Sequence, residues 1–393
     1  MFKLIPTNEN IESVKGFYCD GINAGLKKDG LDLGFIYSDT ICDVSAVFTQ
    51  NRFQAAPLKH FQKHNITKSN FLLVNSKNAN AMTGKKGIDD IEEILEFTKE
   101  QFPSIVNPIM SSTGVIGEYL PKEKIKSSIN KFNLNSKNSL NFAKSIMTTD
   151  SFEKMISFKV ILQDKAFNIA AVAKGAGMIN PSLATMLCFI VTDAAIPKKD
   201  MDELLQKNVK TTFNAISVDG DRSTNDTVML FSNHLSGAYD KEAFDFALNK
   251  VMHNLALKIV KDAEGGKKLA GFEITGAKND NEAKKVALAL ANSLLVKTAL
   301  FGEDPNWGRI ASTIGASGVE CSEDRLKISF EDIVVFNCGE IFFTKDIELK
   351  AHNIMKKDEF TIRCDLGIAD GRFKAYGCDL GYEYVKINAE YRT

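Results

Sequence analysis

The sequence predicts an α/β protein in which helices cover mixed β-sheets. Short apolar runs bounded by turn residues occur towards both ends of the chain, and segments with apolar residues at helical spacing lie between them. The composition, 44% hydrophobic and 25% charged over 393 residues, is that of an ordinary globular protein. Sheets buried under helices are the economical way to cover the apolar faces of both kinds of element.

The first half of the chain alternates between the two patterns. Apolar runs separated by polar turns predict three strands, and segments with apolar residues three and four positions apart predict two helices that lie on the sheet. Two further runs flank a short polar turn and predict a hairpin. The strands are expected at 33–37, 44–49, 71–75, 156–162 and 167–173, and the helices at 89–102 and 122–132.

The second half begins with a buried strand and ends in strands. The run 186–191 is continuously apolar over the length of one strand. Three helices are expected next, at 199–213, 240–262 and 281–300, because each segment has apolar residues at intervals of three or four. The last strands are expected at 326–336, 360–366, 373–376 and 382–387, where alternation is combined with turn glycines.

Charge and hydropathy exclude several function classes. The 49 basic and 50 acidic residues give a net charge of -1, so no basic field is present to attract nucleic acid or an anionic membrane. No apolar stretch approaches the ~20 residues of a membrane helix, and the first sixteen residues have no apolar core of a signal peptide. We therefore expect a cytoplasmic protein whose partners are small molecules.

Cysteine and histidine are arranged neither as a disulfide framework nor as a metal site. The seven cysteines are an odd number, widely spread, with no C-x-x-C pair. His60 and His64 are four residues apart and share a helix face if this segment is helical, but no third ligand stands at metal-site spacing beside them. We expect no metal and no cofactor. With so few histidines, any acyl-transfer chemistry needs another base.

The stretch 174–193 combines a glycine-rich turn with a buried strand. Gly175 and Gly177 allow backbone angles that other residues avoid, Asn180 and Pro181 end any regular element, and the apolar run follows. The turn would thus deliver one hydroxyl, that of Thr185, to the start of the strand. Glycine turns before strands are also common without any catalytic role, so this stretch alone leaves the function open.

Four polar, glycine-linked clusters occur elsewhere. Hydroxyls and amides of this kind can fix a small polar ligand, and Thr113 with Gly114 could direct a hydroxyl and a backbone N–H at a developing oxyanion; ordinary turns are the alternative. The cluster at 219–226 does not fit a calcium-binding loop, because Leu230 stands where the bidentate glutamate would be. The glycine turn does not fit a dinucleotide fingerprint, because Asn180 fills the last glycine position. The clusters span 75–84, 111–117, 147–150 and 219–226.

Taken together and in order, these segments resemble the ArgJ family of ornithine acetyltransferases, also called glutamate N-acetyltransferases. The resemblance covers nearly the whole chain. It rests on VFTQNRFQAAP (47–57), NANAMTG (78–84), STGVIG (112–117), IMTTD (146–150), KGAGMINPSLATML (174–187), VDGDRSTNDT (218–227), KDAEGGKK (261–268), FGEDPNWGRI (301–310) and INAEYRT (387–393).

The resemblance implies a self-cleaving N-terminal-nucleophile enzyme of the ArgJ/DmpA type, a layered helix/sheet/sheet/helix sandwich. It places the cut between Ala184 and Thr185. Residues 1–184 would be an α chain with the oxyanion site, and residues 185–393 a β chain with the nucleophile, the two sharing one intertwined fold and pairing as an α2β2 heterotetramer. A threonine hydroxyl is a weak nucleophile, but the new α-amine, with a pKa of about 7.7 to 8.0, can act as its base.

The resemblance also assigns roles to individual residues. Acetyl passes from N-acetylornithine to the Thr185 hydroxyl, and glutamate then takes it in a ping-pong cycle. Lys174 suits an α-carboxylate and Glu264 suits an amine, because opposite charges make strong hydrogen bonds. The assigned positions are Thr185 as nucleophile, Thr113 and Gly114 for oxyanion stabilisation, and Thr148, Lys174, Thr185, Glu264, Asn388 and Thr393 for substrate binding.

Three alternatives stay open from the sequence. The enzyme could also make N-acetylglutamate from acetyl-CoA, which would then be a co-substrate, and no residue decides this. It could be an N-terminal-nucleophile amidohydrolase or aminopeptidase, in which water accepts the acyl group; Lys174 and Glu264 favour an amino-acid acceptor instead. It could also be an amino-acid-binding protein that never cleaves.

Overall fold

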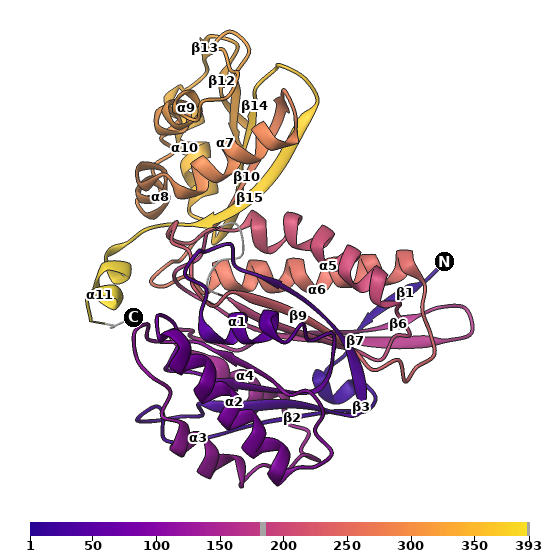
Figure 1. The fold of residues 1–393 in the computed structure, drawn as a ribbon. Helices are drawn as coiled ribbons and strands as arrows, with labels where there is room; N and C mark the ends of the chain where they lie inside the picture. The colour runs from indigo at the N-terminus through magenta and orange to yellow at the C-terminus, as the bar shows by residue number, and fades with distance from the viewer. Residues whose placement is uncertain (181–185, 391–393) are drawn as a thin grey trace.

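The computed structural model describes residues 1–180 and 186–390. Within these residues the chain forms two lobes, each built on one sheet, with the smaller lobe standing on the helical side of the larger one (Figure 1). The predicted positions Ala184, Thr185 and Thr393 lie outside the described residues.

The larger lobe contains a mixed sheet of nine strands in the described part of the chain. Their order is β1-β6-β7-β8-β9-β3-β4-β5, and β2 pairs with β3 beside this path. The strands are β1 (Lys3–Pro6), β2 (Phe17–Ile22), β3 (Leu33–Phe48), β4 (Lys68–Asn75), β5 (Ile109–Ser112), β6 (Lys154–Ile161), β7 (Ala166–Lys174), β8 (Leu187–Thr192) and β9 (Thr227–Ser232).

The strand β3 divides this sheet into two layers. Its first part pairs with β2 and β4, and its last part, 43–48, pairs with β9. The register with β4 shifts between Tyr37 and Cys42, at the polar residues that separate the two strands predicted here. The strands expected at 33–37 and 44–49 are thus one long strand, β3, and its register with β4 shifts where a break between the two was predicted. Apolar residues of both layers, such as Leu72 in β4 and Phe189 in β8, share one core cluster.

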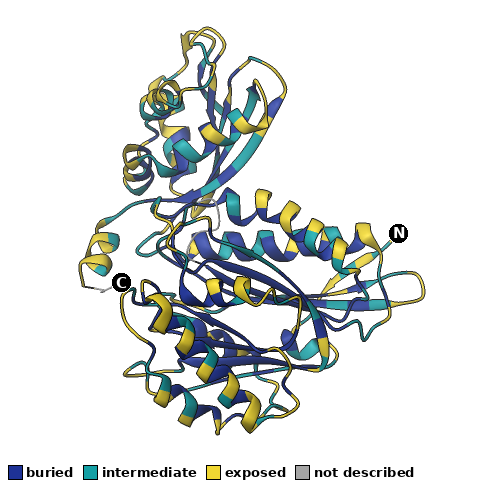
Figure 2. Cartoon of the chain, in the orientation of Figure 1, coloured by how far each residue is buried: buried dark blue, intermediate teal, exposed yellow. Residues whose placement is uncertain are grey.

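Helices cover the outer face of each layer. The helices α5 (Lys198–Thr211) and α6 (Lys241–Lys261) pack on the β7–β9 layer, and α2 (Gly84–Gln101) and α3 (Lys122–Ile129) pack on the β3–β4 layer (Figure 1). Their inward faces are buried and their outward faces exposed (Figure 2). The order helix, sheet, sheet, helix confirms the predicted layered sandwich. Two short helices, α1 (Ala56–Lys63) and α4 (Ser139–Ile146), complete this lobe.

The smaller lobe is a six-stranded sheet covered by helices. Its strand order in the described chain is β13-β12-β11-β14-β10-β15, and its own apolar core lies under α7. The strands are β10 (Leu269–Ala277), β11 (Lys327–Phe330), β12 (Ile333–Asn337), β13 (Glu340–Ile341), β14 (Glu359–Asp365) and β15 (Gly371–Cys378), and the helices are α7 (Asp280–Asn292), α8 (Leu294–Phe301), α9 (Trp307–Ala316) and α10 (Lys345–Met355).

Three predictions of local structure are wrong in this half. The helix expected at 281–300 is two helices, because the Ser293 hydroxyl accepts the amide of Val296 and starts α8 anew. The strand expected at 326–336 is the hairpin β11–β12, turned at Glu331, whose φ is +46°. The strand expected at 382–387 is the helix α11 (Tyr382–Glu390), none of whose described residues is buried. The alternation of Tyr and Val residues is typical of a strand, but these residues pair with none of the described strands.

Strands from both sides of residue 185 occupy one sheet. The strand β8, whose residues are all buried, lies between β7 and β9, antiparallel to β7 and parallel to β9. In this register Leu187 pairs with Lys174. No described helix is long and apolar enough to span a membrane.

Candidate active site

A polar pocket lies where the turn after β7 meets α11 and the loops of the larger lobe. Its cavity of about 170 Å³ is large enough for a small ligand. The residues that line it include every described position to which the sequence assigned a role: Thr113, Gly114, Thr148, Lys174, Glu264 and Asn388. These residues come from segments up to 275 positions apart, so only the tertiary fold brings them together.

Lys174, the last residue of β7, is the central cation of the pocket. Its side chain is buried, and its ammonium donates hydrogen bonds to Thr113 Oγ1 at 3.1 Å and Thr148 Oγ1 at 2.9 Å. Burial lowers the pKa of the Lys174 ammonium, and the nearby carboxylate of Asp150 opposes this shift. Both hydrogen-bond partners are neutral hydroxyls, so neither supplies a negative charge that a substrate carboxylate would have to displace.

The Thr113–Gly114 segment has the geometry of an oxyanion site. The amides of Thr113 and Val115 donate to the carbonyls of Asn75 and Lys77, whereas the Gly114 amide between them has no partner within residues 1–180 and 186–390. Gly114 has φ +131°, and a Cβ there would lie 2.2 Å from the Lys77 carbonyl carbon, so only glycine fits. An unpaired amide and the Thr113 hydroxyl are therefore adjacent in the residues that line the pocket, and groups of these two kinds can stabilise an oxyanion.

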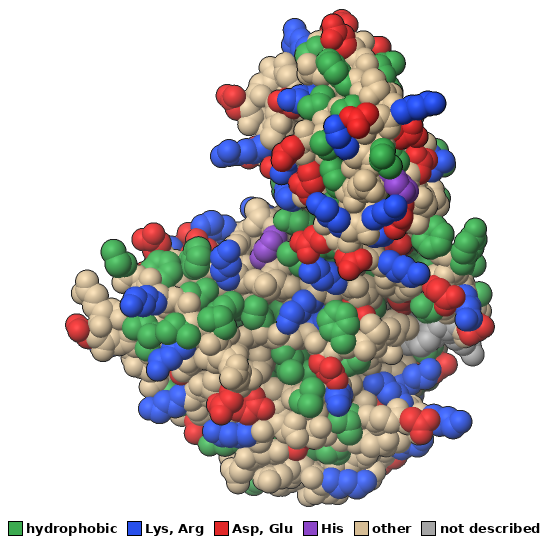
Figure 3. Space-filling view, turned by 180° about the vertical axis from the view of Figure 1, so that it is seen from behind, with side chains coloured by type: hydrophobic (Ala, Val, Ile, Leu, Met, Phe, Trp, Pro, Cys, Tyr) green, Lys and Arg blue, Asp and Glu red, His purple; other side chains and the backbone are tan. Residues whose placement is uncertain are grey.

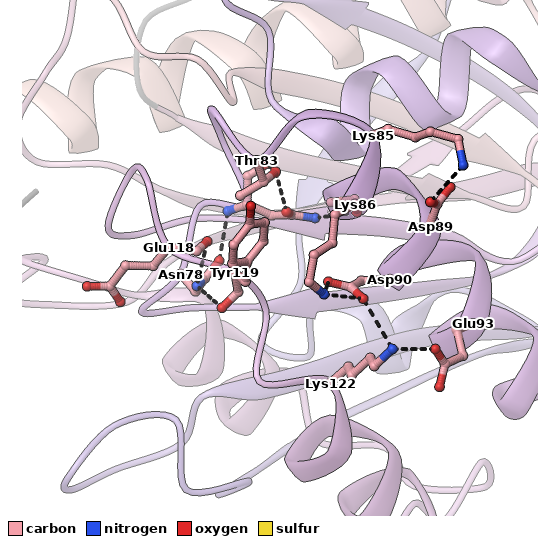
Figure 4. A network of polar contacts seen from close by, with 12 residues as sticks. Asn78, Thr83, Lys85, Lys86, Asp89, Asp90, Glu93, Glu118, Tyr119 and Lys122 are labelled. Atoms are coloured by element: carbon pink, nitrogen blue, oxygen red, sulfur yellow. Dashed lines mark hydrogen bonds and ion pairs between the residues drawn. The ribbon is translucent and has the colours of Figure 1, made fainter.

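The 78–84 loop supports this segment from behind. Asn78 forms bridges with Thr113 and Val115, and its side-chain amide donates to the carbonyls of Glu118 and Tyr119 at 3.2 and 3.0 Å. The Asn78 side-chain oxygen in turn accepts the amide of Asn80 at 2.8 Å (Figure 4). The asparagines of this motif therefore hold the backbone around Thr113 and Gly114, rather than line the pocket themselves.

A buried ion network lies beneath Lys174. Lys154 contacts Asp150 at 2.7 Å and Asp262 at 2.5 Å, and all three side chains are almost completely buried. Asp150 also accepts the amides of Gly175 at 2.6 Å and Thr148 at 3.0 Å. Burial alone would raise the pKa of Asp150, but the charges of Lys174 and Lys154 bring it down to about 2. The network thus fixes both the glycine turn and the 147–150 loop.

Glu264 lines the same pocket as Lys174 and approaches the glycine turn closely. A Cβ on Gly177 would lie 2.4 Å from the Glu264 Cδ, so the second glycine of the turn leaves room for this carboxylate. The Asn388 side chain, from α11, donates to Glu264 Oε2 at 2.7 Å. A carboxylate held in this way, in one pocket with a buried ammonium, can bind the amine of a zwitterion.

The helix α11 reaches the pocket with one face. Tyr384 and Asn388, four residues apart, both line it, and the Tyr384 hydroxyl donates to Asp219 at 3.3 Å. Asp219 also accepts the amides of Met178 at 2.5 Å and Ile179 at 2.9 Å. The 219–226 cluster, from which the sequence excluded a calcium site, therefore ties the glycine turn to α11 at this end.

Asp226 is a functional candidate that sequence reasoning did not single out. Its side chain is completely buried, its Oδ1 accepts the amide of Met186 at 3.1 Å, and its Oδ2 has no hydrogen-bond partner among the described residues. Burial raises the pKa of this carboxyl well above its usual range. The Met186 nitrogen is bonded to the carbonyl carbon of Thr185, so Asp226 lies beside the predicted cleavage position. Its place in the VDGDRSTNDT motif was the available signal.

The arrangement supports acyl transfer to an amino-acid acceptor. The pocket contains a hydroxyl beside an unpaired backbone amide, a buried cation and a carboxylate, and no group of three His, Cys, Asp or Glu side chains of metal-site geometry lies in it among the described residues. These features suit a ligand with both a carboxylate and an amine, bound next to an acyl carbon.

Comparisons with known proteins agree with this geometry. A sequence model described as the ArgJ family matches residues 18–393. A relative from Wolinella succinogenes, named arginine biosynthesis bifunctional protein ArgJ, is 60% identical over the full length of both chains. A relative of the same name from Geobacter sulfurreducens is 42% identical over 97% of this chain and all of its own.

Among solved structures, the arginine biosynthesis bifunctional protein ArgJ from Bacillus halodurans is similar, with 40% identity, a TM-score of 0.48, and coverage of 51% of this chain and 96% of its own. The family model and the two full-length relatives confirm the resemblance seen in the motifs. The chain belongs to the ArgJ family.

Proposed function

We propose that this chain transfers acetyl from N2-acetylornithine to glutamate in arginine biosynthesis, through an acetyl-Thr185 intermediate formed after self-cleavage between Ala184 and Thr185. One observation carries the proposal most directly. Leu187 pairs with Lys174 in the sheet, and Lys174 lies in the pocket with Thr113 and Glu264. Thr185 precedes Leu187 by two residues, which is at most about 7 Å of extended chain.

The reaction follows from these groups. The Thr185 hydroxyl attacks the acetyl carbonyl while its α-amine takes the proton, and the negative oxygen that forms accepts hydrogen bonds from the Gly114 amide and the Thr113 hydroxyl. Collapse of this intermediate breaks the C–N bond, and ornithine leaves with the proton. The glutamate amine then attacks the acetyl ester, which yields N-acetylglutamate and regenerates the Thr185 hydroxyl.

The charges of the pocket support both half-reactions. The two substrates each carry an α-carboxylate, which Lys174 can bind, and ornithine carries a further amine for which Glu264 is suited. Thr148, which accepts a hydrogen bond from Lys174, and Asn388, which donates one to Glu264, hold these two charges in place. We propose that Thr393 adds a polar contact from the chain end.

A second candidate activity is the formation of N-acetylglutamate from acetyl-CoA. The full-length relatives from Wolinella succinogenes and Geobacter sulfurreducens are both named bifunctional, and this supports the wider activity. We propose that the cleaved protein works in the cytoplasm without a cofactor, as an α2β2 heterotetramer of residues 1–184 and 185–393. A hydrolase or aminopeptidase remains the rival, and the acceptor distinguishes it: water instead of glutamate.

The cleavage is tested by intact-mass analysis of the purified protein after incubation. We expect two fragments that meet between Ala184 and Thr185. The variant Thr185→Ala should stay a single 43.4 kDa chain without activity, and Thr185→Ser should retain part of both properties, because only a hydroxyl is required. Full transferase activity in Thr185→Ala would remove Thr185 from the mechanism.

The substrates are tested by supplying donors separately. Purified protein is given glutamate with N-acetylornithine and, in a parallel assay, glutamate with acetyl-CoA. Transfer from the first donor alone indicates a monofunctional enzyme, and transfer from both indicates a bifunctional one. Release of acetate without N-acetylglutamate would favour the hydrolase instead.

A further inference from the structure

We propose that His60, His64 and Glu92 form a binding site for a divalent transition-metal ion such as Zn²⁺, which clamps α1 to α2. The three residues, here called the His–His–Glu cluster, offer ligand atoms that all lie within 4.8 Å of one another. They also line a surface cavity that shares no lining residue with the active-site pocket. The sequence did not reveal this site, because its third ligand stands 28 positions beyond His64.

The two histidines come from one helix and the carboxylate from the next. His60 and His64 are four residues apart across the end of α1, which places both rings on one side, with their centroids 4.5 Å apart. Glu92 belongs to α2, which packs against α1. Ligands from two packed helices form a more rigid site than the same groups on one exposed loop.

The separation of two of the ligand atoms suits tetrahedral coordination. Zn²⁺ binds histidine nitrogen at about 2.0–2.1 Å and carboxylate oxygen at about 2.0–2.2 Å, so two ligand atoms of one tetrahedron lie about 3.3–3.5 Å apart. The separation of His64 Nε2 and Glu92 Oε1 is 3.3 Å. Two imidazoles and one carboxylate are also a ligand set typical of zinc, with water at the fourth position.

Lys63 would compete with the metal ion for the Glu92 carboxylate. Its ammonium contacts the same Glu92 oxygen at 2.7 Å, and both side chains are largely exposed. An exposed ion pair of this kind is weak and easily replaced by a divalent cation. Lys63 therefore neutralises Glu92 when no metal is bound and has to swing away when one binds.

The two helices that the clamp would join also hold two loops of the active site. At the start of α1, the amide of Ala56 donates to the Asn80 carbonyl and the amide of Ala55 donates to the Thr224 carbonyl, both at 2.9 Å. In α2, the Gly87 carbonyl accepts the Asn80 side chain at 3.0 Å. Asn80 is therefore held by both helices, and a metal that joins them would rigidify the 78–84 loop behind Thr113.

The test is a calorimetric titration of the full-length protein, freed of any affinity tag and of metal, with Zn²⁺. We expect one saturable equivalent of Zn²⁺ per chain and a higher Tm in its presence. His64→Ala and Glu92→Gln should each weaken binding by at least about tenfold, and Lys63→Ala should strengthen it. Both ligand variants are on the surface, so they are expected to fold, which circular dichroism checks.

Glu93→Gln is the matched control. Glu93 is the next residue of α2 and is equally exposed, but its carboxylate pairs with Lys122 at 2.5 Å (Figure 4) and with Lys126 at 2.8 Å, neither of which belongs to the cluster. Its variant should bind Zn²⁺ like the wild type. The proposal is overturned if no saturable binding occurs, or if His64→Ala and Glu92→Gln bind as tightly as Glu93→Gln. Neither outcome depends on the proposed transferase activity, because only binding and Tm are measured.

Discussion

Gly177 and Glu264 fit together so closely that a single methyl group at residue 177 would occupy the position of the Glu264 carboxylate, 2.4 Å from its Cδ. The backbone of Gly177 does not have a positive φ, so space and not conformation requires glycine there. The glycine turn that leads towards Thr185 therefore also shapes the pocket wall around Glu264, the residue proposed to bind the substrate amine.

Gly177→Ala should lower kcat/KM for transfer by about 10²-fold, because it displaces Glu264 by about an ångström or more. Steady-state kinetics with N-acetylornithine and glutamate measure this. Gly315→Ala is the control, since Gly315 lies in α9 with no atom within 4 Å of its added Cβ. That variant should keep its activity and gain up to about 1 kcal/mol of stability. Unchanged kinetics in Gly177→Ala would remove Glu264 from the substrate site.

Asp226→Asn should make the protein more stable at high pH and slower in both cleavage and transfer. Burial raises the pKa of Asp226, so the folded state opposes its ionisation. The stability that its protonated form contributes is complete below the unfolded pKa, near 3.9, and is lost as the pH rises through the folded value. Asparagine stays neutral, so the free energy of unfolding of Asp226→Asn should exceed that of the wild type by an amount that grows with pH, to about 1–3 kcal/mol.

Urea unfolding at pH 5 and pH 8 measures this difference, and the pH profiles of cleavage and transfer measure the functional role. A residue that only fills space would change the rates without altering their pH dependence. Wild-type rates in Asp226→Asn, with a wild-type profile, would leave Asp226 without a role beside Thr185.

Asp150→Asn should destabilise the protein at neutral pH and lose this effect in acid. The folded pKa of about 2 lies below the unfolded value of about 3.9, so the carboxylate stabilises the fold above pH 4, and this contribution is lost as the pH falls towards 2. The shift corresponds to about 2–3 kcal/mol. Unfolding free energies of both proteins, measured from pH 7 to pH 2.5, should therefore converge.

Asp89→Asn provides the control for this series. Asp89 forms an exposed pair with Lys85 on α2, so its loss should change the free energy of unfolding by less than about 0.5 kcal/mol at any pH (Figure 4). A constant gap between Asp150→Asn and the wild type down to pH 2.5 would contradict the assignment of the low pKa to Asp150.

The surface charges are mixed in sign (Figure 3), in line with the net charge of -1. On the face turned away in Figure 1, basic and acidic side chains are interspersed over both lobes, and no broad field of one sign is visible (Figure 3). An arrangement of this kind gives no footprint for nucleic acid on that face. Buried charges are instead gathered at Lys174 and in the Lys154–Asp150–Asp262 network beneath it.

Elements with strong local signals were predictable from the sequence. The helix α6 was expected at 240–262 and spans Lys241–Lys261, because its apolar spacing persists over several turns. Breaks inside elements were not predictable in this way. Ser293 and Glu331 divide expected elements by local hydrogen bonding and backbone geometry, which periodicity does not detect.

The sequence by itself determined the family, and through that resemblance the expected class of chemistry and six residues of the pocket, because motifs such as STGVIG and KDAEGG occur in the order that this family has. Only the tertiary structure decided what surrounds them. It buried Asp226 and Lys174, turned 382–387 into a helix that brings Asn388 to Glu264, and placed Glu92 beside His64. The physical reason is that burial, pKa and ligand geometry arise from contacts between distant segments, which local sequence does not encode.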